Sequence, residues 1–308
     1  MQFIIFILAL SVLLFASRQF TKAAVKVGEW MKLPNFVVGI FIVGIGTSLP
    51  ELVSGILAVQ AGSSEILSAN IIGSNISNLL LVTGLAVALN RKSITLGSQY
   101  IYTDLHFLIG SFFVFYLIAY DGQIEFKEAL FGPIIFIFYS FYLIKGETNP
   151  AIQKTKTVNL SKTPYLAFLI LILSAIGIYF GADYTIISLK QIAGELNVPD
   201  SIVSLTVLSL GTTLPELSVN ISAIKQGNPE MAIGNILGSC VFNTLIVPFG
   251  ASLFGSIALS NELTSFSLPV MAASGLFFYL LTHDKKISPW EGILFVIVYT
   301  MVIFKIVS

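Results

Sequence analysis

The sequence predicts an all-α polytopic membrane protein with ten transmembrane helices, arranged as two inverted repeats of five helices. Composition is the first observation, because 56% of the 308 residues are hydrophobic and 10% are charged, whereas soluble domains are about 25% charged. The second is the length of the apolar runs, which suits helices that cross a bilayer core better than the short alternating strands of a membrane barrel. The third is an internal repeat: a motif containing Glu51 recurs around Glu216, and 216 − 51 = 165 positions.

Ten apolar runs define the expected helices. They lie near residues 2–17, 36–60, 65–89, 101–120 and 128–144, and then near 165–189, 201–224, 230–256, 264–282 and 289–307. The first run lacks the preceding basic region of a signal peptide, so we expect it to be a retained helix. Residues 1–145 are therefore expected to form the first five-helix repeat, residues 146–163 a cytoplasmic linker, and residues 164–308 the second, inverted repeat.

The basic residues predict the orientation in the membrane. If the N-terminus lies outside, only Lys127, Lys190 and Lys305 of the 16 lysines and arginines lie outside as well, which leaves 16 − 3 = 13 for the inside. Cytoplasmic loops carry an excess of lysine and arginine. We therefore expect a multi-pass protein of the cell membrane with both termini outside and the long central loop in the cytoplasm.

The repeat extends over two segments without a gap. Residues 33–52 (LPNFVVGIFIVGIGTSLPEL) align with 198–217 (VPDSIVSLTVLSLGTTLPEL), and residues 62–82 align with 227–247. Five spans is an odd number, so the second copy enters the membrane from the opposite side. Inverted repeats of this kind are typical of secondary transporters, which alternate access around a site near the bilayer midplane. A duplication kept only for fold stability would not require the polar residues to recur with the apolar ones.

Each repeat places a proline and a glutamate inside an apolar span. Thr47 and Glu51 share one helical face, while Pro50 lacks an amide proton and its ring clashes with the Gly46 carbonyl. Helices 2 and 7 are therefore expected to be broken, and the exposed carbonyls must face protein or a wet cavity. Carbonyl, hydroxyl and carboxylate oxygens together form a cation site. The second copy supplies Thr212, Thr213, Pro215 and Glu216.

The span after each motif adds a second polar face. Ser74 and Asn78 are four residues apart, as are Ser239 and Asn243, so each pair can face the motif helix of the other repeat. Gly73 and Gly238 are expected to let the backbones approach closely. Ordinary packing of small residues between membrane helices explains glycine and serine, but it explains the two asparagines less readily.

The charge of the two glutamates indicates the ligand. An unpaired carboxylate at the centre of a membrane helix costs about 2.5–3.5 kcal/mol, and the spans 35–59, 66–89, 200–224 and 231–256 contain no lysine or arginine. The neutralising charge must therefore be mobile. Calcium takes about six to eight oxygen ligands, whereas magnesium demands a smaller and stricter cage. Sodium accepts similar oxygens, and competition for shared ligands is a physical basis for exchange.

At these residues the chain resembles the calcium/cation antiporter superfamily, and particularly the sodium/calcium exchangers of prokaryotic and archaeal type. Both repeats carry motifs of the family's "GTS(L)PE" and "GNxxGSxxxN" type in matching order, GTSLPE and ANIIGSNISN in the first repeat and GTTLPE and GNILGSCVFN in the second. The resemblance implies that Glu51 and Glu216 bind calcium, that Asn78 and Asn243 complete the centre, and that hydroxyl and carbonyl groups form flanking sodium sites. The flanking groups are Thr47, Ser48, Thr212, Thr213, Ser74 and Ser239, with the backbone carbonyls of Gly44 and Ser209.

The expected function is secondary active antiport of Ca²⁺ against Na⁺ by a monomer in the lipid bilayer, with the ions as substrates and with no cofactor and no nucleic acid partner. Some relatives carry aspartate where this chain has Asn243, and the lost charge argues against potassium dependence and keeps protons as an alternative counter-ion. A passive cation channel is a further alternative. An intramembrane enzyme is disfavoured, because one cysteine and two histidines do not suit a zinc centre.

Overall fold

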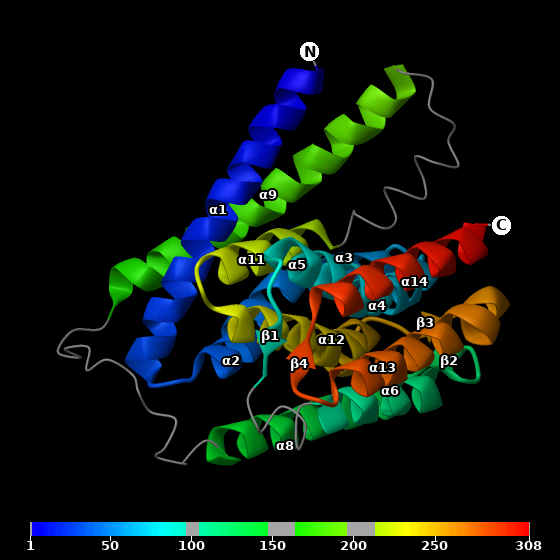
Figure 1. Ribbon diagram of the computed structural model, residues 1–308. Helices are drawn as coiled ribbons and strands as arrows, with labels where there is room; N and C mark the ends of the chain where they lie inside the picture. The colour runs from blue at the N-terminus through cyan, green and yellow to red at the C-terminus, as the bar shows by residue number, and fades with distance from the viewer. Residues whose placement is uncertain (1, 97–104, 147–163, 196–212, 308) are drawn as a thin grey trace.

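The computed structural model describes residues 2–96, 105–146, 164–195 and 213–307, and this part of the chain is almost entirely helical (Figure 1). The first repeat contains α1 (Gln2–Met31), α2 (Asn35–Val38), the π-helix η1 (Gly39–Gly44), α3 (Ile45–Gln60), α4 (Ser64–Ile76), the π-helix η2 (Ser77–Val82), α5 (Thr83–Asn90), α6 (Leu105–Ala119), α7 (Phe126–Ala129) and α8 (Phe131–Gly146). The second contains α9 (Tyr165–Glu195), α11 (Leu214–Lys225), α12 (Pro229–Ser252), the π-helix η4 (Leu263–Ser267), α13 (Leu268–Thr282) and α14 (Pro289–Val307).

Eight helical segments of the described chain are long and apolar enough to cross a membrane, and α6 is a shorter apolar helix. The remaining expected span, 201–224, is represented by α11, and its earlier part lies outside the described residues. The all-α, ten-helix plan of two inverted repeats is therefore confirmed in its helical content. The expected boundary between the repeats, at residues 146–163, stays a prediction.

Two short antiparallel strand pairs connect the repeats. The strand β1 (Ile94–Thr95) pairs with β4 (Lys286–Ile287), and β2 (Gln123–Ile124) pairs with β3 (Ile257–Ala258). Paired strands lie on the same side of the bilayer, so an even number of spans must separate β1 from β4. The apolar helices α6, α8, α9, α12 and α13 lie between them, and the expected span that ends in α11 supplies the sixth. The strand pairs thus agree with the inverted topology.

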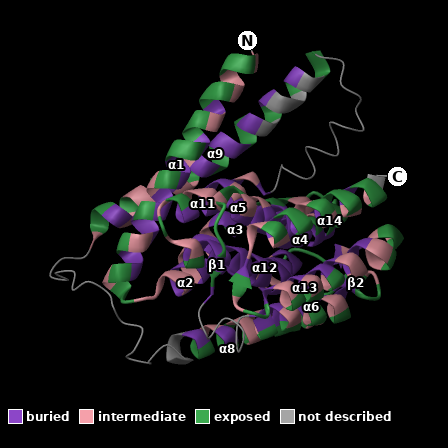
Figure 2. Cartoon of the chain, viewed as in Figure 1, coloured by how far each residue is buried: buried purple, intermediate pink, exposed green. Residues whose placement is uncertain are grey.

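The helix α12 lies at the centre of the bundle. It packs against η1, α3, α2, α8, α11 and α6, and it is mostly buried, whereas α1, α8 and α14 expose much of their surface (Figure 2). Its contact with η1 is a direct contact between backbones. A Cβ atom added at Gly238 would lie 2.5 Å from the Ile40 carbonyl oxygen, and one added at Gly44 would lie 3.0 Å from the Ser239 amide nitrogen. Glycine is therefore required where these two helices cross.

Gly73, the repeat equivalent of Gly238, has open space around it, since a Cβ atom there would meet nothing within 4 Å. The expectation that both glycines allow a close approach of backbones is therefore confirmed for Gly238 and wrong for Gly73. Gly73 lies on an exposed face of α4, so no neighbouring helix demands the missing side chain.

The expected break in the second span takes a different form. The helix α3 continues through Pro50, and the irregular backbone is the π-helix η1, which ends six residues before the proline. A π-segment widens the helix by one residue per turn and is often found at functional sites. In the second repeat α11 begins at Leu214, with Thr213 at its N-cap and Pro215 in the first turn, where proline costs no helical hydrogen bond.

The helices α1 and α9 form a separate layer, in which they run side by side and project beyond the other helices (Figure 1). Gly181 of α9 approaches the backbone of Leu13, and Gly177 approaches Ala16. The helix α1 extends to Met31, well beyond the expected span 2–17. The basic residues expected in the loop after this span therefore lie on the exposed surface of the helix; they are Arg18, Lys22 and Lys26.

Candidate cation-binding site

The polar residues of both motifs are buried between α3, α4, η2, α11 and α12. Glu51 is 5% exposed and Glu216 is 1% exposed, which removes both carboxyl groups from bulk solvent. The described residues of the expected site are all buried as well: Thr47, Ser48, Ser74, Asn78, Thr213, Ser239 and Asn243, with Gly44. Ser209 and Thr212 lie outside the described residues.

One polar contact joins the motif helix of the first repeat to α12. The Thr47 hydroxyl lies 3.2 Å from Asn235 Oδ1, 3.3 Å from Ser239 Oγ and 3.4 Å from the Gly44 carbonyl oxygen. Ser239 Oγ also donates to the Gly44 carbonyl at 3.3 Å. Thr47, Ser239 and Gly44, which were expected in the site from their separate motifs, therefore meet at one point.

A second contact joins α4 to α12. Asn243 Nδ2 donates to Ser74 Oγ at 3.4 Å, and Ser74 Oγ in turn lies 3.3 Å from the Ile71 carbonyl to which it donates. This arrangement uses the nitrogen of the Asn243 amide and leaves its oxygen free to accept. The polar residues of the two repeats are thus in direct contact across the centre of the bundle.

Six buried oxygen atoms of the expected site residues have no hydrogen-bond partner. They are Ser48 Oγ, Glu51 Oε2, Asn78 Oδ1, both carboxyl oxygens of Glu216, and Asn243 Oδ1. Buried polar atoms are normally paired, and an unpaired one costs about 1–3 kcal/mol. Glu51 also lies close enough to Glu216 for their charges to repel. A bound cation would satisfy these oxygens and remove the repulsion.

Most of the described helices around the site carry no fixed positive charge, and the lysine of α11, Lys225, lies at its exposed end. The helices α3, α4 and α12 and the π-helix η2 contain no lysine or arginine. Within the described chain no three His, Cys, Asp or Glu side chains gather at one place. A cation between the repeats would therefore rest on two carboxylates and on neutral oxygens, a donor set that suits calcium or sodium better than zinc or another transition metal.

Reasoning from the sequence did not assign Asn235, Asn220 or Asn75 to the site. Asn235 is fully buried, and its Nδ2 donates to Asn220 Oδ1 at 2.8 Å. Asn75 donates to the Ile71 carbonyl at 2.7 Å, and its own Oδ1 is buried without a partner. Asn235 recurs as Asn70 in the first repeat, which was an available signal. Asn220 and Asn75 have no asparagine at the equivalent repeat position, so the repeat pattern gave no signal for them.

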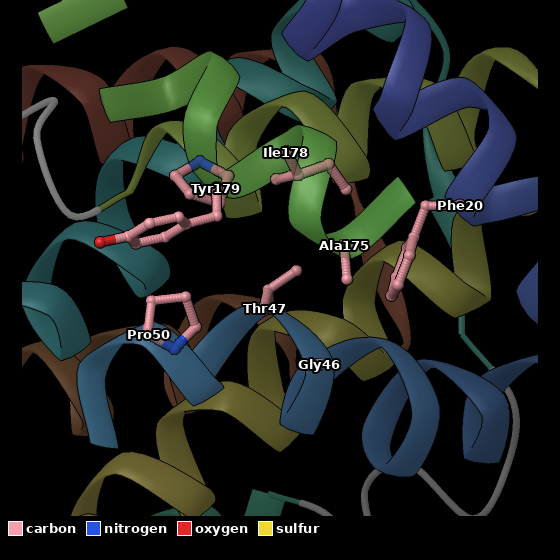
Figure 3. A pocket seen from close by; sticks show the side chains of 8 residues that line it. Phe20, Gly46, Thr47, Pro50, Ala175, Ile178 and Tyr179 are labelled. Atoms are coloured by element: carbon pink, nitrogen blue, oxygen red, sulfur yellow. The ribbon is translucent and has the colours of Figure 1, made fainter. Parts of the chain in front are cut away.

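A small cavity lies between the α1–α9 layer and the two motif helices. Figure 3 shows Thr47 and Pro50 of α3 facing Ala175, Ile178 and Tyr179 of α9. Phe20 of α1, Gly46 of α3 and Pro215 of α11 complete the lining. The cavity thus reaches the polar cluster at Thr47 from the side that faces the two long helices.

Inverted repeats that enclose a buried oxygen-lined site define the class of protein: it is a multi-pass membrane transporter of the secondary type. The family follows from the whole sequence. Residues 1–145 and 166–307 match the model of the sodium/calcium exchanger protein family, and the chain belongs to that family.

Two archaeal relatives cover almost the whole chain. An uncharacterized membrane protein of Methanocaldococcus jannaschii is 29% identical over 97% of this chain and 95% of its own length. The sodium/calcium exchanger MaX1 of Methanosarcina acetivorans is 28% identical over 99% of both chains. A solved structure of the sodium/calcium exchanger from Methanococcus jannaschii is 28% identical, covers 98% of this chain and 97% of its own, and has a TM-score of 0.81. Another, of the exchanger NCX_Mj soaked with Na⁺ and Sr²⁺, has a TM-score of 0.82 at 27% identity and covers 98% and 97%.

Proposed function

We propose that the protein is a secondary active antiporter that exchanges Ca²⁺ for Na⁺ at the site between α3, α4, η2, α11 and α12. One observation carries the proposal: two glutamates from equivalent motifs are both buried, with unpaired oxygens and with no lysine or arginine on α3, α4, η2 or α12. The similar proteins that are known as sodium/calcium exchangers support the same pair of ions.

The donor groups fall into two sets. Calcium would bind Glu51 and Glu216, whose two negative charges match its own, together with the amide oxygens of Asn78 and Asn243. Sodium would bind hydroxyl and carbonyl oxygens that flank this centre and share its carboxylates. The proposed sodium ligands are Thr47, Ser48, Ser74, Thr212, Thr213 and Ser239, with the carbonyls of Gly44 and Ser209.

The layer formed by α1 and α9 is the proposed moving part. This layer and the motif helices together line the cavity beside Thr47. The two strand pairs, which do not involve α1 or α9, connect the repeats to each other. A shift of the two long helices would open the site to one side of the membrane and then to the other, which is alternating access. The distribution of lysine and arginine favours termini outside and the central loop in the cytoplasm. We propose that a monomer performs the cycle without a cofactor.

Protons are the second candidate for the counter-ion. The unpaired oxygens of Glu51 and Glu216 could be neutralised by protons as well as by sodium, and Asn243 provides no third charge. In this case the two glutamates would carry the counter-ion themselves.

The test is calcium uptake into sealed vesicles that contain the purified protein. Radioactive Ca²⁺ uptake is measured with an internal sodium load, with a matched proton gradient, and with choline as the control. Uptake driven by sodium supports the proposal, and uptake driven only by protons selects the alternative. Calcium flux that needs no counter-gradient would contradict antiport and indicate a channel.

A further inference from the structure

We infer that Asn235 and Asn220 are positioning residues that orient the Thr47 hydroxyl for a monovalent cation, and that the pair sets the affinity for sodium rather than for calcium. The inference rests on the proposed function, because it assigns two further residues to the sodium part of the same site. Neither asparagine was expected to be a ligand from the sequence, and both are completely buried.

The single hydroxyl proton of Thr47 is the starting point. Three acceptors lie within 3.5 Å, of which Asn235 Oδ1, at 3.2 Å, is the nearest, and the Glu216 carboxyl group also interacts with this hydroxyl. A cation needs the lone pairs of the hydroxyl oxygen, so the proton must point away from the ion. When Asn235 takes the proton, both the Thr47 oxygen and the Gly44 carbonyl oxygen stay available to a cation. When Gly44 takes it, the proton occupies the space that the cation would use.

Asn220 accepts a hydrogen bond from the end of the Asn235 amide that is turned away from Thr47. The Asn235 nitrogen donates to Asn220 Oδ1 at 2.8 Å, so the oxygen is the end turned toward the threonine. If the Asn235 amide turned over, its nitrogen would donate to Thr47 and occupy a lone pair that the cation needs. Asn220 Nδ2 is buried without a hydrogen-bond partner. A pair that served only stability would not need to bury an unpaired donor.

The first repeat does not reproduce this support. Its equivalent of Asn235 is Asn70, which is only partly buried and whose Oδ1 lacks a partner, and its equivalent of Asn220 is Gly55. Asn70 and Gly55 therefore do not reproduce the hydrogen-bonded pair of Asn235 and Asn220, and Thr212, the repeat equivalent of Thr47, lies outside the described residues.

The experiment measures ion binding and does not require coupled transport. Sodium is titrated into purified, calcium-free protein against a choline control, and calcium is titrated separately. The variants are Asn235→Ala, Asn220→Ala, Thr47→Ala and the double variant of Asn235 and Thr47. The matched control is Asn228→Ala, which removes a different hydrogen bond between two asparagines, from Asn35 Nδ2 to Asn228 Oδ1 at 3.0 Å. Asn35 lies on the same expected span as Thr47, twelve residues before it.

We expect Asn235→Ala to raise the half-saturating sodium concentration about fivefold to tenfold, the effect of one lost hydrogen bond, with calcium affinity changed less than about twofold. Asn220→Ala should also raise the half-saturating sodium concentration, by a smaller factor. This variant replaces Asn235→Ala in the experiment if Asn235→Ala does not fold. In the Thr47→Ala background the Asn235 substitution should have no further effect, because the asparagine acts through the hydroxyl.

Four results would overturn the inference. In the first three, the Asn235→Ala substitution still weakens sodium binding in the Thr47→Ala background, changes calcium and sodium affinity equally, or has the same effect as Asn228→Ala. The fourth result is a wild-type protein that binds no sodium. A wild-type protein that binds no sodium would also refute sodium antiport, whereas the other outcomes are separate from the fate of the proposed function. Sodium binding that responds to Asn235 in a protein without sodium-driven calcium uptake would leave the inference standing and refute the antiport. If exchange is normal but sodium binding does not change in Asn235→Ala, the proposed function stands and the inference fails.

Discussion

The two copies of the glutamate motif have nearly the same sequence and different backbones. In the first repeat Pro50 lies inside α3, after the π-helix η1, whereas in the second Pro215 lies in the first turn of α11. The next spans differ too, since η2 interrupts the first and α12 is one regular α-helix. The residues of the site thus stand at equivalent sequence positions in the two repeats, whereas the backbones that carry them differ. The described backbones of the two repeats therefore differ where their sequences agree.

The largest effect is expected at the two equivalent glutamates, where the same substitution should have the same effect in both repeats. Glu51→Gln and Glu216→Gln should each reduce calcium transport about a hundredfold or more, because each leaves a divalent ion with one unbalanced charge in a buried site. Radioactive calcium uptake measures the loss, and Glu65→Gln, which changes an exposed glutamate of α4, should transport normally. If one glutamine variant retained wild-type exchange, the paired-carboxylate site would be wrong.

The equivalent glycines Gly238 and Gly73 should respond in opposite ways. Gly238→Ala places a methyl group against the Ile40 carbonyl, and the two backbones cannot separate without loss of packing, so we expect about 2–3 kcal/mol of destabilisation. Gly73→Ala meets open space and should be as stable as the wild type. Thermal unfolding in detergent compares the two variants. Equal losses of stability would mean that the repeats pack alike.

The two prolines provide a smaller test. Replacing Pro50 with alanine restores the amide that can donate to the Gly46 carbonyl inside α3, which should stabilise the protein by about 1 kcal/mol. Replacing Pro215 with alanine should have little effect on stability, because the first turn of α11 lacks that hydrogen bond in any case. The same unfolding measurement applies. A stabilising effect at Pro215 as large as that at Pro50 would contradict the difference in backbone.

The smallest effect concerns the two equivalent serines. Ser239→Ala removes the contacts to Gly44 and Thr47 and should weaken sodium binding about threefold, whereas Ser74→Ala frees the Asn243 amide and should weaken calcium binding by a similar factor. Titration of each ion into each variant distinguishes these effects. Identical profiles for the two variants would show that the hydroxyls are interchangeable.

The sequence predicted those features that depend on residue type and spacing. Apolar runs identified the spans, and the repeat identified Glu51 and Glu216 as an equivalent pair, both of which are buried. The π-helices could not be predicted, because they arise where η1 and η2 pack against other helices and not from a local pattern. Nor could the sequence reveal the role of Asn220, whose equivalent is Gly55, because only the folded chain places it against Asn235.

The strand pairs have a consequence for the origin of the molecule. The strands β1 and β3 occupy equivalent places in the two repeats, as do β2 and β4, so each pair joins the same two segments taken from opposite halves. Two identical five-helix chains inserted in opposite directions would form both pairs at once, related by a two-fold axis. The strand contacts within this one polypeptide are therefore those that an antiparallel homodimer of the five-helix unit would make.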